Sequence, residues 1–194
     1  MQLCRDKKMG GFTIIEIVVV IGVMALIAGM TLVSFPEFSE RISIEQEAGK
    51  FSLALRRAQS YALAVREFGA GSGIFPGYGV NVSLATPDQY LVFGDPNRSS
   101  RYESFLNEAV ETTTVERRVR VIRICGNSQS VPAGSCTLSS ADLFYIRPGP
   151  TIVLTGVDSG LAATYNDIKV TLASFDGSIQ KNVIIWSTGQ ISTQ

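Results

Sequence analysis

The sequence contains no histidine, and this absence excludes several familiar kinds of site. A Ser-His-Asp triad cannot form without its general base. The chain also has no phosphate-binding loop of the GxxxxGKS type, and no pair of carboxylates can be placed for glycoside hydrolysis. We therefore expect a protein that is not an enzyme and that has no cofactor and no metal.

Cysteine is scarce as well, with three in the whole chain. Ten residues separate Cys125 from Cys136, a spacing that matches no familiar zinc site. A bridge between these two would close a short loop and stabilise the fold by under about 3 kcal/mol. A possible disulfide and two free thiols are the alternatives that the sequence leaves open.

Neither sign of charge is in excess, since 17 basic side chains balance 17 acidic ones. A protein that binds nucleic acid through its overall field needs a positive surplus. We expect no nucleic-acid partner.

The dominant feature that is present is an apolar run over residues 12–35, whose one ionisable side chain is Glu16. As a helix this run would be about 36 Å long, enough to cross a hydrocarbon core of about 30 Å. The basic residues Arg5, Lys7 and Lys8 precede it. They predict a single-pass membrane helix with a cytoplasmic N-terminus and a C-terminal domain outside the cytoplasm.

A secretory signal peptide also begins with positive charge, but the pattern here differs. Its small-residue cleavage site follows a shorter apolar run, whereas Gly10 and Gly11 precede this one. Cleavage after Gly11 would remove a basic leader that includes Cys4 and leave the apolar segment on the mature chain.

Glu16 is costly in a bilayer, by roughly 2.5 to 3.5 kcal/mol unless another group pairs with it. After cleavage, Phe12 would carry a new amino group that a neighbouring chain's Glu16 can meet in a stack of parallel helices. The alternative is that Glu16 reaches the membrane edge or is protonated.

The segment GGFTIIEI resembles the prepilin cleavage and methylation motif of type IV pilins and type II secretion pseudopilins, with isoleucines where the family usually has leucine. The resemblance implies that Gly11 precedes the scissile bond and that Phe12 is the N-methylated mature terminus. It also implies that Glu16 pairs with a neighbouring subunit during assembly.

The helical pattern continues beyond the apolar run, through an apolar stripe at steps of three and four residues. Glycines from residue 69 onward end it. The stripe consists of Ile44, Ala48, Phe51, Leu55, Ala58, Ala62 and Val65. The charged residues between them are predicted to face solvent; they include Glu45, Glu47, Lys50, Arg56, Arg57 and Arg66.

Antiparallel strands follow, with hairpins predicted over residues 77–95, 141–156 and 167–192 and a further strand over residues 116–125. The fold class is therefore α+β. We expect a long N-terminal helix, membrane-spanning in its first half and amphipathic in its second, packed against antiparallel sheets as in pilins. The predicted parts are a leader (1–11), a transmembrane helix (12–35), an amphipathic continuation (36–68) and a β-rich globular domain (69–194).

The order of helix, strands and the final STGQI resembles that of GspH/FimT-type minor pseudopilins. It implies a structural subunit of a type II secretion pseudopilus or a type IV pilus, processed by prepilin peptidase and assembled through its helix for protein secretion. The implied partners are other pilins in a helical filament, the peptidase/methyltransferase, and the inner-membrane assembly platform with its ATPase. The implied location is the inner membrane and then the filament.

Two other functions remain open. One is a tip pilin for adhesion or DNA uptake, with its site in residues 96–114 or 125–136. The other is a membrane-anchored enzyme. Within the first region, Asp95-Pro96-Asn97-Arg98 is interpreted as an exposed turn rather than a calcium loop, because acidic ligands at the EF-hand spacing are missing.

Overall fold

The computed structural model describes residues 11–116, 118–128, 131–147, 149 and 151–194, without the side chains of residues 31–36 and 131–134. The chain divides into two compact units. The first ends at Ser39, and the second is Glu40–Gln194.

One helix, α1 (Ile14–Leu63), runs through the boundary between the units. It begins at Ile14 because Thr13 caps it. The Thr13 Oγ1 accepts the backbone N–H of Glu16 at 3.3 Å, and the Thr13 carbonyl accepts that of Ile17 at 3.3 Å. The helix ends before Val65, which has a left-handed φ of 54°.

The predicted fold class is wrong. Among the residues whose side chains are described, no helix is long and apolar enough to cross a membrane. Residues 31–36 of the predicted spanning segment lie outside the described side chains.

The expected packing of the helix along a sheet over its whole length is also not observed. No side chain of residues 14–30 is buried, and the first buried position among the described side chains of α1 is Ser43. Two antiparallel sheets dominate the second unit instead.

The first sheet has six strands in the order β3-β2-β1-β6-β7-β8, and all neighbours are antiparallel. A short 3₁₀ helix, η1 (Ser104–Leu106), precedes β3. The strands are β1 (Gly77–Ser83), β2 (Gln89–Asp95), β3 (Ala109–Thr114), β6 (Ser140–Tyr145), β7 (Ile152–Asp158) and β8 (Leu161–Tyr165).

The second sheet has five strands in the order β11-β10-β9-β4-β5, again antiparallel throughout. The three predicted hairpins are confirmed as the pairs β1–β2, β6–β7 and β9–β10. The strands are β4 (Val119–Ser128), β5 (Val131–Ser135), β9 (Asp167–Ser174), β10 (Gln180–Trp186) and β11 (Ile191–Thr193).

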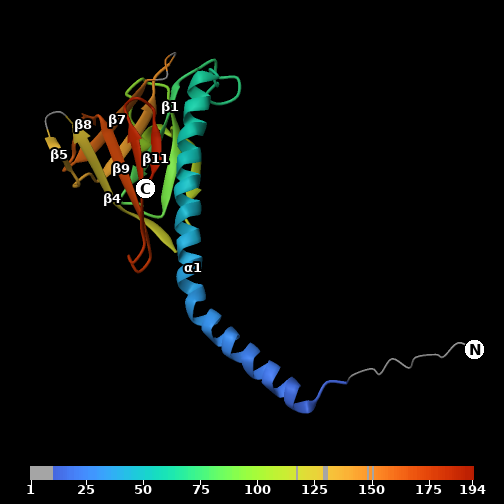
Figure 1. Ribbon diagram of the computed structural model, residues 1–194. Coiled ribbons are helices and arrows are strands. Elements are labelled where there is room, and N and C mark those ends of the chain that lie inside the picture. Colours follow the sequence, from blue (N-terminus) through green and yellow to red (C-terminus); the bar gives the residue numbers. More distant parts are fainter. Residues whose placement is uncertain (1–10, 117, 129–130, 148, 150) are drawn as a thin grey trace, which may run out of the picture. The chain divides into compact units, whose positions relative to one another are not determined.

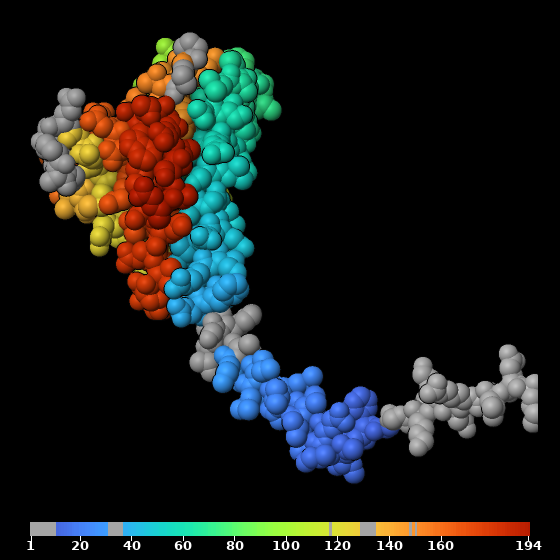
Figure 2. Space-filling view, in the orientation of Figure 1, coloured from blue at the N-terminus to red at the C-terminus, as the bar shows by residue number. Residues whose placement is uncertain are grey.

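The core of the second unit lies between its part of α1 and the strands of both sheets, which Figure 1 shows on one side of that part of the helix. The Phe51 and Tyr90 rings meet edge to face, with centroids 5.1 Å apart. Figure 2 shows the C-terminal strands, in red, directly beside the helix surface, where Ile191 and Thr193 border the same shallow hollow as Ser52.

The predicted apolar stripe is confirmed from Ile44 to Ala62, because all six of its members in that range are buried. Val65 is the exception: it is 46% exposed and lies beyond the end of the helix.

Candidate functional site

The predicted processing and assembly residues lie in the first unit, at the start of the described chain. Gly10 and the basic leader residues lie outside the described part. Phe12 is 79% exposed, and a Cβ added to Gly11 would have no atom within 4 Å. Glu16 is exposed in the first turn of α1. Both residues that flank the predicted cleavage point are therefore exposed.

The helix surface that follows is apolar and exposed on all sides. A Cβ added to Gly22 or Gly29 would also meet no atom within 4 Å. Exposed apolar surface of this extent marks an interaction site. The large exposed side chains are Ile14, Ile15, Ile17, Val18, Val19, Val20, Ile21, Val23, Met24, Leu26, Ile27 and Met30.

The two cysteines of the second unit, Cys125 and Cys136, form a disulfide. It joins β4 to the residue that follows β5, so it closes the β4–β5 hairpin.

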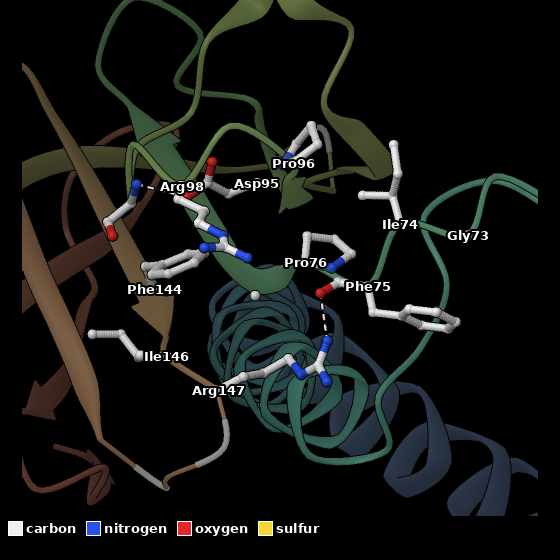
Figure 3. Close-up of a pocket in the computed structure, with 12 residues that line it drawn as sticks. Gly73, Ile74, Phe75, Pro76, Asp95, Pro96, Arg98, Phe144, Ile146 and Arg147 are labelled. Carbon is white, nitrogen blue, oxygen red and sulfur yellow. Dashed lines mark hydrogen bonds between the residues drawn. The ribbon is translucent and has the colours of Figure 1, made fainter.

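A separate pocket of about 740 Å³ opens in the second unit, at one end of the first sheet (Figure 3). The segment that leads into β1, the loop after β2 and the end of β6 form its walls. Its larger apolar side chains are Ile74, Phe75, Phe144 and Ile146.

Two guanidinium groups also line this pocket, and Figure 3 shows them entering it from opposite sides of the view. Arg147 donates from one terminal nitrogen to the Phe75 carbonyl oxygen, while its Nε is buried without a hydrogen-bond partner. Arg98 is exposed. In the described part of the chain, no ion pair involves either arginine.

The acidic residue of the pocket, Asp95, is 1% exposed, and the backbone satisfies its oxygens. Oδ1 accepts the N–H of Ser99 at 3.0 Å, and Oδ2 accepts that of Ser100 at 2.6 Å. Arg98 has a left-handed φ of 63°, and Ser100 one of 60°. The described residues contain no cluster that could hold a metal ion, which agrees with a turn here rather than a calcium loop.

Two more buried carboxylates hold the same loop, and sequence reasoning missed both. Glu108 Oε2 accepts the N–H of Glu103 at 2.8 Å. Asp142 Oδ1 accepts from the Asn81 amide at 2.7 Å, and the Tyr102 backbone also donates to the Asp142 carboxylate. Burial raises the pKa of Asp142 to about 6 and raises the pKa of Glu108. For Asp142 the available signal was an acid within an otherwise apolar predicted strand, whereas Glu108 lies in a region for which no strand was predicted.

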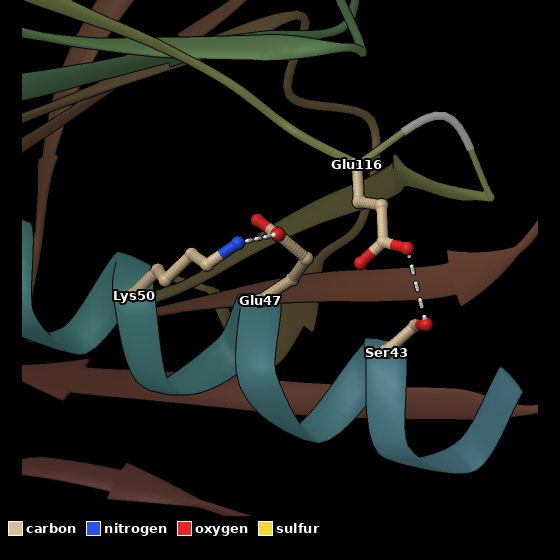
Figure 4. Close-up of polar contacts among 4 residues, drawn as sticks. All are labelled: Ser43, Glu47, Lys50 and Glu116. Carbon is tan, nitrogen blue, oxygen red and sulfur yellow. Dashed lines mark hydrogen bonds and ion pairs between the residues drawn. The ribbon is translucent and has the colours of Figure 1, made fainter. Parts of the chain in front are cut away.

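A further buried acid lies on α1, where solvent exposure was predicted. Glu47 is 1% exposed; its Oε1 lies 2.6 Å from the Lys50 Nζ, and its Oε2 is buried without a partner (Figure 4). The hydrogen bond and charge of Glu47 raise the pKa of Lys50. One turn earlier, the Ser43 hydroxyl donates to Glu116 at 3.4 Å.

Comparisons with protein-family models, with characterised proteins and with solved structures find no match for this chain.

Proposed function

We propose that this chain is a structural subunit of a filament of the type IV pilin or type II secretion pseudopilin kind. In this proposal the chain is cut between Gly11 and Phe12 and assembles through the first part of α1 for protein secretion. The observation that carries the proposal is the helix surface of residues 14–30, which is apolar and exposed and holds one ionisable side chain, Glu16.

Neighbouring copies of the same helix are suitable partners for that surface. Each copy offers apolar side chains all round, so parallel helices that stack around one another bury them without a specialised groove. Glu16 lies in the first turn, close along the chain to the exposed Phe12. A new amino group on Phe12 of one copy would supply the positive charge that Glu16 of the next copy needs once water is excluded.

The partners that belong to this proposal are a prepilin peptidase with methyltransferase activity and an assembly platform with its ATPase. Processing takes place at the inner membrane in this proposal, before the subunit enters the filament.

The first test is the N-terminus of the natural protein, determined by intact-mass measurement and N-terminal sequencing. We expect a chain that begins at Phe12 with a methylated amine. Gly11→Trp should keep its leader, because a bulky side chain beside the scissile bond obstructs the enzyme. Gly11→Ala, a small replacement, serves as the matched control and should be processed far better. A mature chain that begins at Met1, or beyond residue 35, would contradict the proposal.

A further inference from the structure

We propose that the pocket at the end of the first sheet binds a small apolar carboxylate. Arg98 and Arg147 would bind the carboxylate, and the aromatic and aliphatic side chains around them would contact the apolar body. This binding site is independent of the proposed filament function.

The charges that line the pocket favour an anion with a single charge. Arg98 and Arg147 bring two positive charges, and Asp95 brings the one acidic side chain among the lining residues. Both Asp95 oxygens accept backbone N–H groups from its own loop. One positive charge is therefore left over, which matches a carboxylate better than a doubly charged phosphate monoester.

The arginines have free donors to offer such a ligand. A guanidinium group carries five N–H donors, and its fork matches the two oxygens of a carboxylate. Arg147 gives one donor to the Phe75 carbonyl oxygen, which fixes the side chain at the pocket, while its buried Nε has no acceptor. Leaving a buried donor unpaired costs free energy that a bound acceptor would recover.

The loop after β2 fixes the second arginine. The Asp95 carboxylate holds the two residues that follow Arg98, and Arg98 itself has a left-handed backbone conformation. Ordering a loop when a ligand binds costs conformational entropy. This cost is smaller when a buried acceptor already holds the loop backbone. The backbone at Arg98 is thus held beside the pocket before a ligand arrives.

The apolar side chains explain why the ligand carries an apolar body. Phe75 is 50% exposed, Ile74 is 44% exposed and Ile146 is 40% exposed. They remain open to solvent beside two cations, in a pocket of about 740 Å³. That volume lies within the usual range for small-molecule sites.

The test is calorimetric titration of the full-length protein with 4-ethylbenzoate and with its neutral analogue 4-ethylbenzamide. We expect saturable binding of the benzoate and binding of the benzamide that is about tenfold weaker or worse, because a charge-assisted pair is lost. Arg147→Gln and Arg98→Gln should each weaken benzoate binding about tenfold. Arg123→Gln, an exposed arginine on β4 away from the pocket, is the matched control and should bind as the parent does.

A second measurement locates the ligand without any variant. In methyl NMR spectra, the benzoate should shift the signals of Ile74 and Ile146, which line the pocket, and leave Ile124 in the core unchanged. Equal affinity for benzoate and benzamide, absence of binding, or shifts elsewhere would overturn the proposal. Tighter binding of 4-ethylphenyl phosphate than of the benzoate would overturn the choice of a carboxylate. None of these outcomes bears on cleavage after Gly11, so the two proposals fail separately.

Discussion

At the scale of single residues, buried carboxylates are the unusual feature of the second unit. Asp95 ends β2, Glu108 precedes β3 and Asp142 lies on β6, and each accepts at least one backbone N–H from the loop of residues 96–107. The second oxygen of Glu108 is buried without a partner. Burying an acid is unfavourable unless hydrogen bonds replace its water. The three acids therefore secure an irregular loop whose backbone donors would otherwise need solvent.

Asp142 makes a testable contribution to the pH dependence of stability. Burial raises its folded-state pKa from 3.8 to about 6, and the bonds from Asn81 and Tyr102 and the charge of Arg101 oppose this only in part. A raised carboxyl pKa means that the folded state holds the proton more tightly. The free energy of unfolding should then fall as pH rises from about 4 to about 6, by about 3 kcal/mol for this group.

The measurement is urea unfolding between pH 4 and pH 7 for the parent protein and Asp142→Asn. The variant should lose most of the fall, since its amide does not titrate, while Glu108, whose pKa burial also raises, contributes in the same direction. The control is Asp88→Asn, which changes an exposed acid and should leave the slope as it was. An unchanged slope in Asp142→Asn would contradict the assignment.

At the scale of elements, the sequence predicted what local patterns encode. The apolar stripe of α1 and three hairpins follow from residue spacing and turn composition, and all of these are observed apart from Val65. Four strands were missed, for physical reasons. β8 (Leu161–Tyr165) exposes four of its five residues and shows no alternation, and β11 (Ile191–Thr193) has only three residues. β3 forms by pairing with β2 and β5 by pairing with β4, so neither strand could be predicted from its own residues.

Pairings between strands that are far apart in the sequence could not be predicted either, because local patterns do not encode them. β1 pairs with β6 and β4 pairs with β9, and nothing local in either strand specifies the partner. The pocket depends on the first of these pairings, because it brings Arg147, two residues after the end of β6, beside the segment that leads into β1. The arginines are visible in the sequence, but their proximity is not.

The ion pair of Glu47 on α1 leads to a prediction about the stability of the fold. Its partner Lys50 is half exposed, so Lys50→Ala removes little packing but leaves the carboxylate buried and unpaired. We expect the free energy of unfolding to fall by about 1 to 2 kcal/mol. Adding Glu47→Met should restore most of that loss, because an apolar side chain of similar size removes the buried charge.

The matched control is Lys181→Ala, which breaks a surface pair with Glu45 at 3.4 Å. An exposed pair contributes under about 1 kcal/mol, so this variant should unfold almost as the parent does. Equal losses in Lys50→Ala and Lys181→Ala would mean that burial of Glu47 contributes nothing to the effect. Chemical denaturation at neutral pH measures all of these variants.

At the scale of the whole molecule, the two units differ in whether they bury their apolar side chains. The second unit buries its own in a core between α1 and two sheets. The described residues of the first unit expose theirs along the helix. The sequence places the predicted processing and assembly residues in the first unit. It also predicted a membrane-spanning helix there, which the described residues do not form.

The decisive prediction for assembly concerns Glu16. A carboxylate in an apolar helix surface becomes costly when neighbouring helices exclude water, unless an opposite charge meets it, and the Phe12 amine of another copy is the group that the proposal supplies. Glu16→Gln keeps the shape and removes the charge. We expect this variant to be produced and cleaved normally yet to enter filaments poorly.

Glu16→Leu separates pairing from simple apolar contact. If burial of apolar surface alone drives assembly, the leucine should assemble as well as the parent or better, because it adds apolar area and removes a desolvation cost. If pairing with the Phe12 amine is required, the leucine should assemble no better than the glutamine. Glu40→Gln makes the same change on the same helix within the second unit and should behave as the parent does. The measurement is recovery of each variant in sheared filaments, with crosslinking to neighbouring subunits. Recovery of Glu16→Leu at the parent level would remove the carboxylate from assembly and leave it a role only in processing.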